Sequence, residues 1–253
     1  MKKCVAQDFK KLESLERDFF DKRIITKGNL SKYAFFRPSL FKMISKDTNF
    51  AAIDKKSVII QFIYLPLILL RLILNVYIYK QNGMVFCTER NDETNSCRYV
   101  NCVPSIKKSN YLRLRYSFNH KPFIFDNVID IAPLILIIKA ISRLYILNLN
   151  DKKLIKDISN SYLEKYNIDT FSMIKKKVSE YILLKFFFEL LIKFNMPKRI
   201  VFVSNNFFIP LITLAKDKSI PTYEVAHALA HEFHPNYSFK RFAEHNFYPD
   251  FLI

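Results

Sequence analysis

An α/β fold built on a parallel sheet is the class of structure that this chain predicts, mainly because a strand, a helix and a second strand follow one another near its end. Residues 199–204 form a short β-branched and aromatic run, typical of a buried strand. Residues 207–218 place apolar side chains at helical spacing, and Pro210 falls in the first turn, where it is tolerated. Residues 220–225 predict the second strand, so the segment is one βαβ unit with parallel strands.

Length and glycine content narrow the class further. The chain has 253 residues, 50% of them hydrophobic, which suffices for one α/β domain with helical additions. Strand-like runs at 83–87 and 123–126 extend the predicted sheet. Residues 162–194 predict one long helix, and residues 131–143 predict a helix with a basic face. The two glycines, Gly28 and Gly83, cannot form a Gly-rich dinucleotide fingerprint or a P-loop. Nucleotide-binding proteins of those two kinds are therefore disfavoured.

The predicted organisation is a basic helical region at 1–57 followed by a Rossmann-like domain at 58–248. That domain opens with an apolar helix at 58–79 that is long enough to span a bilayer. Pro66 and Arg71 interrupt it, and a charge at mid-bilayer is costly. These residues favour a helix that packs in the domain or docks on a membrane surface, with a core helix and a true span as alternatives.

Net charge and cysteine pattern bear on partners and compartment. The formal charge of +17 implies acidic partners such as anionic lipid head groups, a lipid-linked diphosphate, a sugar nucleotide or nucleic acid. Basic and aromatic residues alternate at 107–121, which we interpret as a solvated basic hairpin rather than a nucleic-acid groove. The four cysteines form no CxxC pair, which indicates reduced thiols in a cytoplasmic protein and disfavours a zinc site.

Four of the five histidines fall in the last 27 residues, at His227, His231, His234 and His245. They follow the second strand of the βαβ unit, so they are expected beyond the carboxyl end of a parallel strand, where open α/β sheets bind ligands. On a helix, the spacings of four and three residues between the first three would suit a divalent metal. Pro235 argues against such a helix, and the HExxH pattern is absent.

The end of the chain also resembles a known family. The run Ile-Pro-Thr-Tyr-Glu-Val, a following His, then His-x-x-Tyr-Ser-Phe and Tyr-Pro-Asp-Phe-Leu-Ile resemble bacterial glycosyltransferases of the GT-B type that build capsules, O-antigens and other surface polysaccharides. The close match covers 199–253, and a looser one that includes Phe35-Phe-Arg-Pro38 extends through much of the chain. The matching positions are Glu224, His227, His234, Tyr237, Pro249 and Asp250.

The resemblance implies a Rossmann-like parallel sheet with flanking helices, similar to the N-terminal, acceptor-side domain of a GT-B enzyme. It implies transfer of a sugar from a nucleotide-sugar, which is a donor substrate rather than a cofactor, to a saccharide or lipid-linked acceptor. Residues 249–253 would begin the family's second domain, so full activity is expected to need a C-terminal domain, which a separate chain could provide. The expected location is cytoplasmic, peripheral to the inner face of a bacterial membrane, with an anionic membrane surface as partner and no nucleic acid.

Inverting sugar transfer requires a base for the acceptor hydroxyl and groups that steady the departing diphosphate. His227, which matches the family histidine, is the first candidate for a catalytic imidazole, and Glu224 is the second catalytic candidate. No metal ligand is assigned. The residues expected to bind substrate are His231, His234, Tyr237 and Asn205.

Three other functions stay open. Ala226 and Ala228 stand where the family has Gln and Gly beside its histidine, and an alanine side chain cannot hydrogen-bond a sugar. A non-catalytic remnant or binding module of the same fold is therefore the first alternative. The second is a metal-dependent hydrolase that uses the histidine cluster, and the third is a basic nucleic-acid-binding protein.

Overall fold

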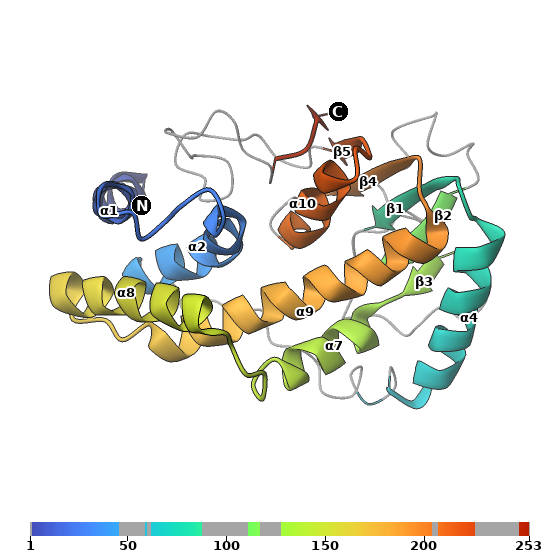
Figure 1. Cartoon of the computed structure of the whole chain (residues 1–253), viewed down its shortest axis with the longest axis horizontal. Coiled ribbons are helices and arrows are strands. Elements are labelled where there is room, and N and C mark those ends of the chain that lie inside the picture. Colours follow the sequence, from blue (N-terminus) through green and yellow to red (C-terminus); the bar gives the residue numbers. More distant parts are fainter. Residues whose placement is uncertain are drawn as a thin grey trace.

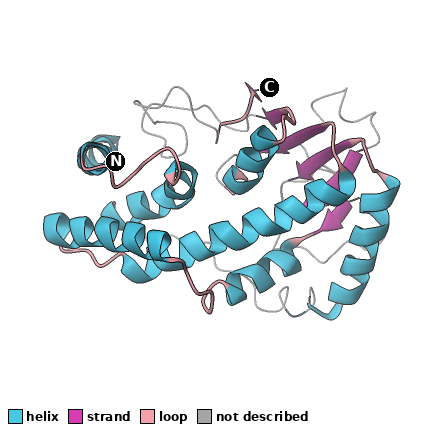
Figure 2. Ribbon diagram, viewed as in Figure 1, coloured by secondary structure: helices cyan, strands magenta, loops and turns pink. Residues whose placement is uncertain are grey.

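The computed structural model describes residues 2–45, 59, 62–87, 111–116, 128–203, 207–225 and 248–252. They form a sheet flanked by helices, which confirms the predicted α/β class (Figures 1 and 2). The sheet has six strands in the order β3-β2-β1-β4-β5-β6, and every pairing is parallel. This is the strand order of the doubly wound Rossmann fold. The strands are β1 (Gly83–Cys87), β2 (Tyr111–Arg115), β3 (Val128–Asp130), β4 (Arg199–Val203), β5 (Thr222–Val225) and β6 (Phe251–Leu252).

A long helix, α9 (Phe171–Asn195), is the centre of the helical layer. It contacts five other helices and runs across the middle of the view in Figure 1. The remaining helices are α1 (Lys2–Asp21), α2 (Leu30–Ile44), α4 (Leu65–Ile78), α7 (Ala132–Ile141), α8 (Leu149–Tyr166) and α10 (Ile209–Asp217).

Both faces of the sheet are buried. Side chains of successive strand residues point to opposite faces, so each strand contributes to two clusters. Burial on both sides explains why the strands read as nearly continuous apolar runs. The face that packs against the helices includes Met84, Phe86, Leu112, Leu114, Ile200 and Phe202. The opposite face carries Val85, Tyr111, Val201, Val203 and Val225.

A buried ion pair joins the first two helices. The Arg37 side chain of α2 is fully buried, and its Nη2 donates to Glu16 Oε2 of α1 at 2.9 Å while its Nε donates to the other oxygen. The hydroxyl of Tyr33 also donates to Glu16, at 2.7 Å. This carboxylate fastens α1 to α2, and α2 in turn contacts α9 and α10.

The βαβ unit predicted from the sequence is confirmed. The strands expected at 199–204 and 220–225 are β4 and β5, the helix expected between them is α10, and the two strands pair in parallel. The strand expected at 83–87 is β1, whereas the one expected at 123–126 lies outside the described residues.

Two expectations were wrong. We expected one long helix from about residue 162, but α8 ends at Tyr166 and α9 begins at Phe171. Asn167 stops α8 because it adopts the left-handed conformation, with φ 53° and ψ 39°, which Asn tolerates better than most residues. The prediction of a solvated basic hairpin was wrong for 111–115, which form the interior strand β2, pair with β1 and β3, and are largely buried.

The apolar segment at 58–79 contains α4, which starts one residue before Pro66. Ile68, Leu72 and Val76 are its buried residues, and the helix contacts α9 and β3. Among the helices that the structure describes, none has the length and apolarity required to cross a membrane.

Substitution by alanine should destabilise the protein at Gly83 but not at Gly28. A Cβ atom on Gly83 would lie 1.9 and 2.2 Å from ring carbons of Tyr111, which is only 5% exposed. Because this ring is packed in the sheet, we expect Gly83→Ala to lower the free energy of unfolding by about 1–3 kcal/mol. Urea denaturation of the full chain measures it.

Gly28→Ala is the matched control for that substitution. The nearest atom to its added Cβ would be Thr26 Oγ1 at 3.9 Å, an ordinary contact. We expect a change within about 0.5 kcal/mol, the usual range for surface substitutions. Equal destabilisation by both substitutions would contradict the close approach of Tyr111 to β1.

Candidate functional site at the carboxyl edge of the sheet

The strand order defines where a ligand site is expected. From β1 the chain proceeds to β2 and β3 on one side, and later to β4, β5 and β6 on the other. Ligands of open α/β sheets bind outside the carboxyl ends of the strands at such a switch point. In this chain the switch point lies between β1 and β4.

Two aromatic rings meet at this switch point. Tyr116 directly follows β2, and Phe207 is the fourth residue after β4. Their rings stack with centroids 4.5 Å apart and an interplanar angle of 6°. Strands β2 and β4 flank β1 and are about 10 Å apart, since neighbouring strands are separated by about 4.8 Å. The ring pair therefore bridges the space beside the end of β1.

Charged side chains from α7 and α9 adjoin the ring pair. Lys139 Nζ donates a hydrogen bond to the Tyr116 hydroxyl at 2.5 Å and lies 4.0 Å from Glu180 Oε1. Lys177 Nζ donates to the other carboxylate oxygen of Glu180 at 2.8 Å. We call Tyr116, Lys139, Lys177, Glu180 and Phe207 the switch-point cluster.

Burial shapes the electrostatics of this cluster. Glu180 is 1% exposed, so its charge is compensated by two lysines rather than by water. Burial lowers the pKa of Lys139; the Glu180 carboxylate opposes this effect, and the charges of Lys177 and Lys176 add to it. Two ammonium groups around one carboxylate leave an excess of positive charge beside an aromatic surface. Such an arrangement can bind a phosphate and a sugar ring or base.

A buried ion pair orients α7. Arg115, the last residue of β2, donates from Nη2 to Asp130 Oδ2 at 3.3 Å, and both residues are 2% exposed. Asp130 Oδ1 accepts from the backbone N–H of Ala132, the first residue of α7, at 3.1 Å. This carboxylate thus fixes the start of the helix that presents Lys139 two turns later.

Of the six site residues expected from the sequence, the structure describes Glu224. It lies in β5 opposite Phe202, is fully buried and points to the helix-covered face, because Tyr223 and Val225 pack on the other face. The other five lie outside the described residues, so their predicted roles stay predictions. They are His227, His231, His234, Tyr237 and Asn205.

Asp250, which matched the family pattern, lies at the opposite edge of the sheet. Its Oδ2 accepts from the backbone N–H and the hydroxyl of Thr222 at 2.8 and 2.7 Å. Thr222 is the first residue of β5, and Phe251 then pairs with β5 as the start of β6. Asp250 therefore aligns β5 with β6, away from the carboxyl edge.

The sequence signals of the switch-point cluster were weak. Its members come from four segments that are far apart in the chain, and their approach depends on the strand order. The available signals were a helix with a basic face that contains Lys139 and a basic, aromatic run that contains Tyr116. Neither pattern indicated Glu180 as their common partner.

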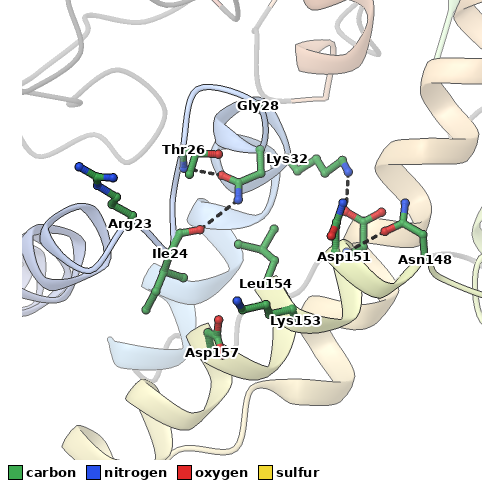
Figure 3. Close-up of a pocket in the computed structure, with 12 residues that line it drawn as sticks. Arg23, Ile24, Thr26, Gly28, Lys32, Asn148, Asp151, Lys153, Leu154 and Asp157 are labelled. Carbon is green, nitrogen blue, oxygen red and sulfur yellow. Dashed lines mark hydrogen bonds and ion pairs between the residues drawn. The ribbon is translucent and has the colours of Figure 1, made fainter.

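A separate polar pocket of about 420 Å³ lies between the α1–α2 connection and the start of α8 (Figure 3). Lys32 Nζ donates to Asp151 Oδ1 at 2.5 Å across its wall, and Asn148 caps α8 by accepting from the Asp151 N–H at 2.8 Å. Three cations and two carboxylates line this pocket, so its charges nearly balance, and none of the expected site residues is among them. We therefore place the candidate site at the sheet edge.

Neither a metal site nor a related protein adds to the assignment of this site. Within the described ranges, no group of three or more His, Cys, Asp or Glu side chains could hold a metal ion. The chain matches no protein-family model, no curated protein and no solved structure. The fold and the geometry of the site therefore define the class of protein, a Rossmann-like α/β domain with a polar and aromatic cluster at its switch point.

The bonds of Asp250 predict a pH-dependent contribution to stability. Burial raises the pKa of its carboxyl, but hydrogen bonds from Thr222 and the Lys216 ammonium at 3.4 Å outweigh burial, so the pKa is lowered from 3.8. A depressed pKa stabilises the fold above the unfolded-state value, and this contribution is lost as pH falls through the folded-state value. We expect Asp250→Asn to cost about 1 kcal/mol at pH 7 and progressively less below about pH 4.

Urea denaturation between pH 7 and pH 3 measures this difference. Asp217→Asn is the control, because Asp217 is 54% exposed in its 3.9 Å pair with Lys185 and surface pairs contribute little. If Asp250→Asn lowers the free energy of unfolding by the same amount at pH 7 and pH 3, the lowered pKa of Asp250 is contradicted.

Proposed function

We propose that this chain takes part in sugar transfer from a nucleotide-sugar to a saccharide or lipid-linked acceptor, as a GT-B-like glycosyltransferase of bacterial surface polysaccharide synthesis. The switch-point cluster is the main support for the proposal. It combines aromatic rings, which suit a sugar or base, with two lysines, which suit a diphosphate. The parallel Rossmann-like sheet is the fold on which the resembling family is built.

In this proposal each side chain has a separate role. The ammonium groups of Lys139 and Lys177 neutralise the diphosphate of the donor or of a lipid-linked acceptor, and Glu180 holds both lysines in place. His227 follows β5 and would deprotonate the acceptor hydroxyl. Glu224, one residue before the end of β5, would support the position of His227 from inside the domain.

Lys139 of the switch-point cluster supplies the first test. We expect Lys139→Gln to weaken binding of inorganic pyrophosphate and of nucleoside diphosphates by about tenfold or more, the scale for losing a charged hydrogen bond. Lys165→Gln is the matched control, because Lys165 pairs with Asp18 at 2.8 Å on an exposed surface. Titration calorimetry measures both, and equal affinities for the two variants and the wild type would refute the site.

The pyrophosphate affinity measured in this titration should also depend on pH. Lysine is cationic below its pKa, and burial lowers the pKa of Lys139 from 10.5. Pyrophosphate affinity should therefore begin to fall at a lower pH than for an ordinary lysine, whereas Lys139→Arg should hold its affinity across that range because arginine stays charged. Binding without transfer to any acceptor would identify the alternative, a binding module of this fold.

Substitution of His227 tests the proposed catalytic role of this residue separately. We expect His227→Ala to weaken ligand binding by about 1–3 kcal/mol and to leave the melting temperature nearly unchanged, while His245→Ala changes neither. A structural histidine would instead lower the melting temperature by several degrees when removed. Loss of stability without any effect on ligand affinity would remove the functional assignment of His227.

A further inference from the structure

One side of α4 is apolar and exposed. Its buried residues recur every fourth position and pack toward α9 and β3. The side chains on the outer side occupy about half of the helix circumference at 100° per residue. We call them the α4 face: Leu67, Leu69, Leu70, Ile73, Leu74, Tyr77 and Ile78, which are 38–78% exposed.

The α4 face contains no charged residue. A helix at the surface of a soluble domain normally turns polar side chains to water, and a helix that is apolar all round is covered by protein or lipid. Contiguous apolar patches on monomers are usually binding surfaces. We therefore expect the α4 face to be covered when the protein works.

A second group of exposed apolar side chains lies where α7 leads into α8. Leu144, Ile146 and Leu149 are 82–83% exposed, and Ile141 at the end of α7 is 48% exposed. In Figure 1 this connection and the first turn of α4 both lie along the lower edge of the molecule. The rest of α4 rises from that edge toward β1 (Figure 1).

The residues around these apolar groups indicate the chemistry of the partner. Lys80 follows α4, Arg143 lies in the α7–α8 connection, and both are exposed on a chain with a net charge of +17. Tyr77, which is 78% exposed, has the amphipathic side chain found at membrane interfaces. Cations beside apolar side chains attract anionic lipid head groups and allow the side chains to enter the acyl boundary.

We propose that the α4 face docks this domain on an anionic lipid bilayer. Helix α4 lies in the boundary between head groups and acyl chains, with Lys80 at its end among the lipid phosphates. Lipid suits this surface better than a second folded protein, because acyl chains adapt to a convex row of long side chains. This docking surface is independent of the switch-point cluster and of the reaction proposed for it.

The experiment measures co-sedimentation of the full chain with vesicles. The chain should bind vesicles of phosphatidylglycerol and phosphatidylcholine more tightly than vesicles of phosphatidylcholine alone, and added salt should weaken binding to the anionic vesicles. The triple variant Leu70→Gln, Ile73→Gln, Tyr77→Gln should bind the anionic vesicles at least about tenfold more weakly. The control pair Leu163→Gln, Phe171→Gln removes side chains that are 49% and 47% exposed elsewhere, and should bind within about twofold of the wild type.

Fluorescence gives a second measurement that leaves the other residues of the α4 face in place. The chain contains no tryptophan, so Ile73→Trp introduces a single reporter on α4. Its emission should shift to shorter wavelength with anionic vesicles, whereas that of Leu163→Trp should not. Equal vesicle binding by the wild type and the triple variant, or an unshifted Ile73→Trp, would overturn the proposal. Conversion of a wild-type dimer to a monomer by the triple variant, without vesicle binding by either, would overturn it in favour of a second copy of this chain.

Discussion

Parallel pairing of β1 on both of its edges is the constraint from which the rest of the structure follows. Parallel neighbours require a connection that crosses a face of the sheet. Each pairing therefore places an apolar connecting segment over the strands and buries them. The same pairing aligns all carboxyl ends on one edge. Gly83 shows how closely the strands are packed, since the ring of Tyr111 occupies the space that a side chain would need.

The switch-point cluster depends on this alignment through a chain of contacts. The ends of β2 and β3 are held together by Arg115 and Asp130, and Asp130 in turn fixes the first residue of α7. Helix α7 then brings Lys139 to Tyr116 and Glu180. Removing one partner from a buried ion pair typically costs about 3–5 kcal/mol, so Asp130 acts as a positioning residue for the site as well as a structural one.

The sequence predicted the local parts of the fold well and the non-local parts poorly. The βαβ unit of β4, α10 and β5 was predictable because its apolar residues recur at strand and helix spacing. Strand β2 was missed because its arginines imitate a solvent-exposed segment. Arg115 is tolerated in the interior by Asp130, a partner 15 residues away that no periodicity indicates. The break at Asn167 was missed because a single left-handed residue ends α8.

For the site, the sequence predicted the correct edge of the sheet but not the residues of the switch-point cluster. The carboxyl end of β5 follows from the βαβ unit, and Glu224 lies there as expected, although its side chain points into the domain. Tyr116, Lys139 and Glu180 come together because strand order brings β2, α7 and α9 to one edge. Side chains that meet only through topology have no signature in the order of residues.

Helix α7 runs from the switch-point cluster to the second group of exposed apolar side chains. Lys139 points to the switch-point cluster, whereas Ile141, two residues later, is 48% exposed beside the α7–α8 connection. Residues two apart on a helix face nearly opposite directions, so one short helix serves both surfaces. The ten residues of α7 are about 15 Å long. The exposed apolar side chains at the α7–α8 connection thus lie within about one helix length of the lysines proposed to bind a diphosphate.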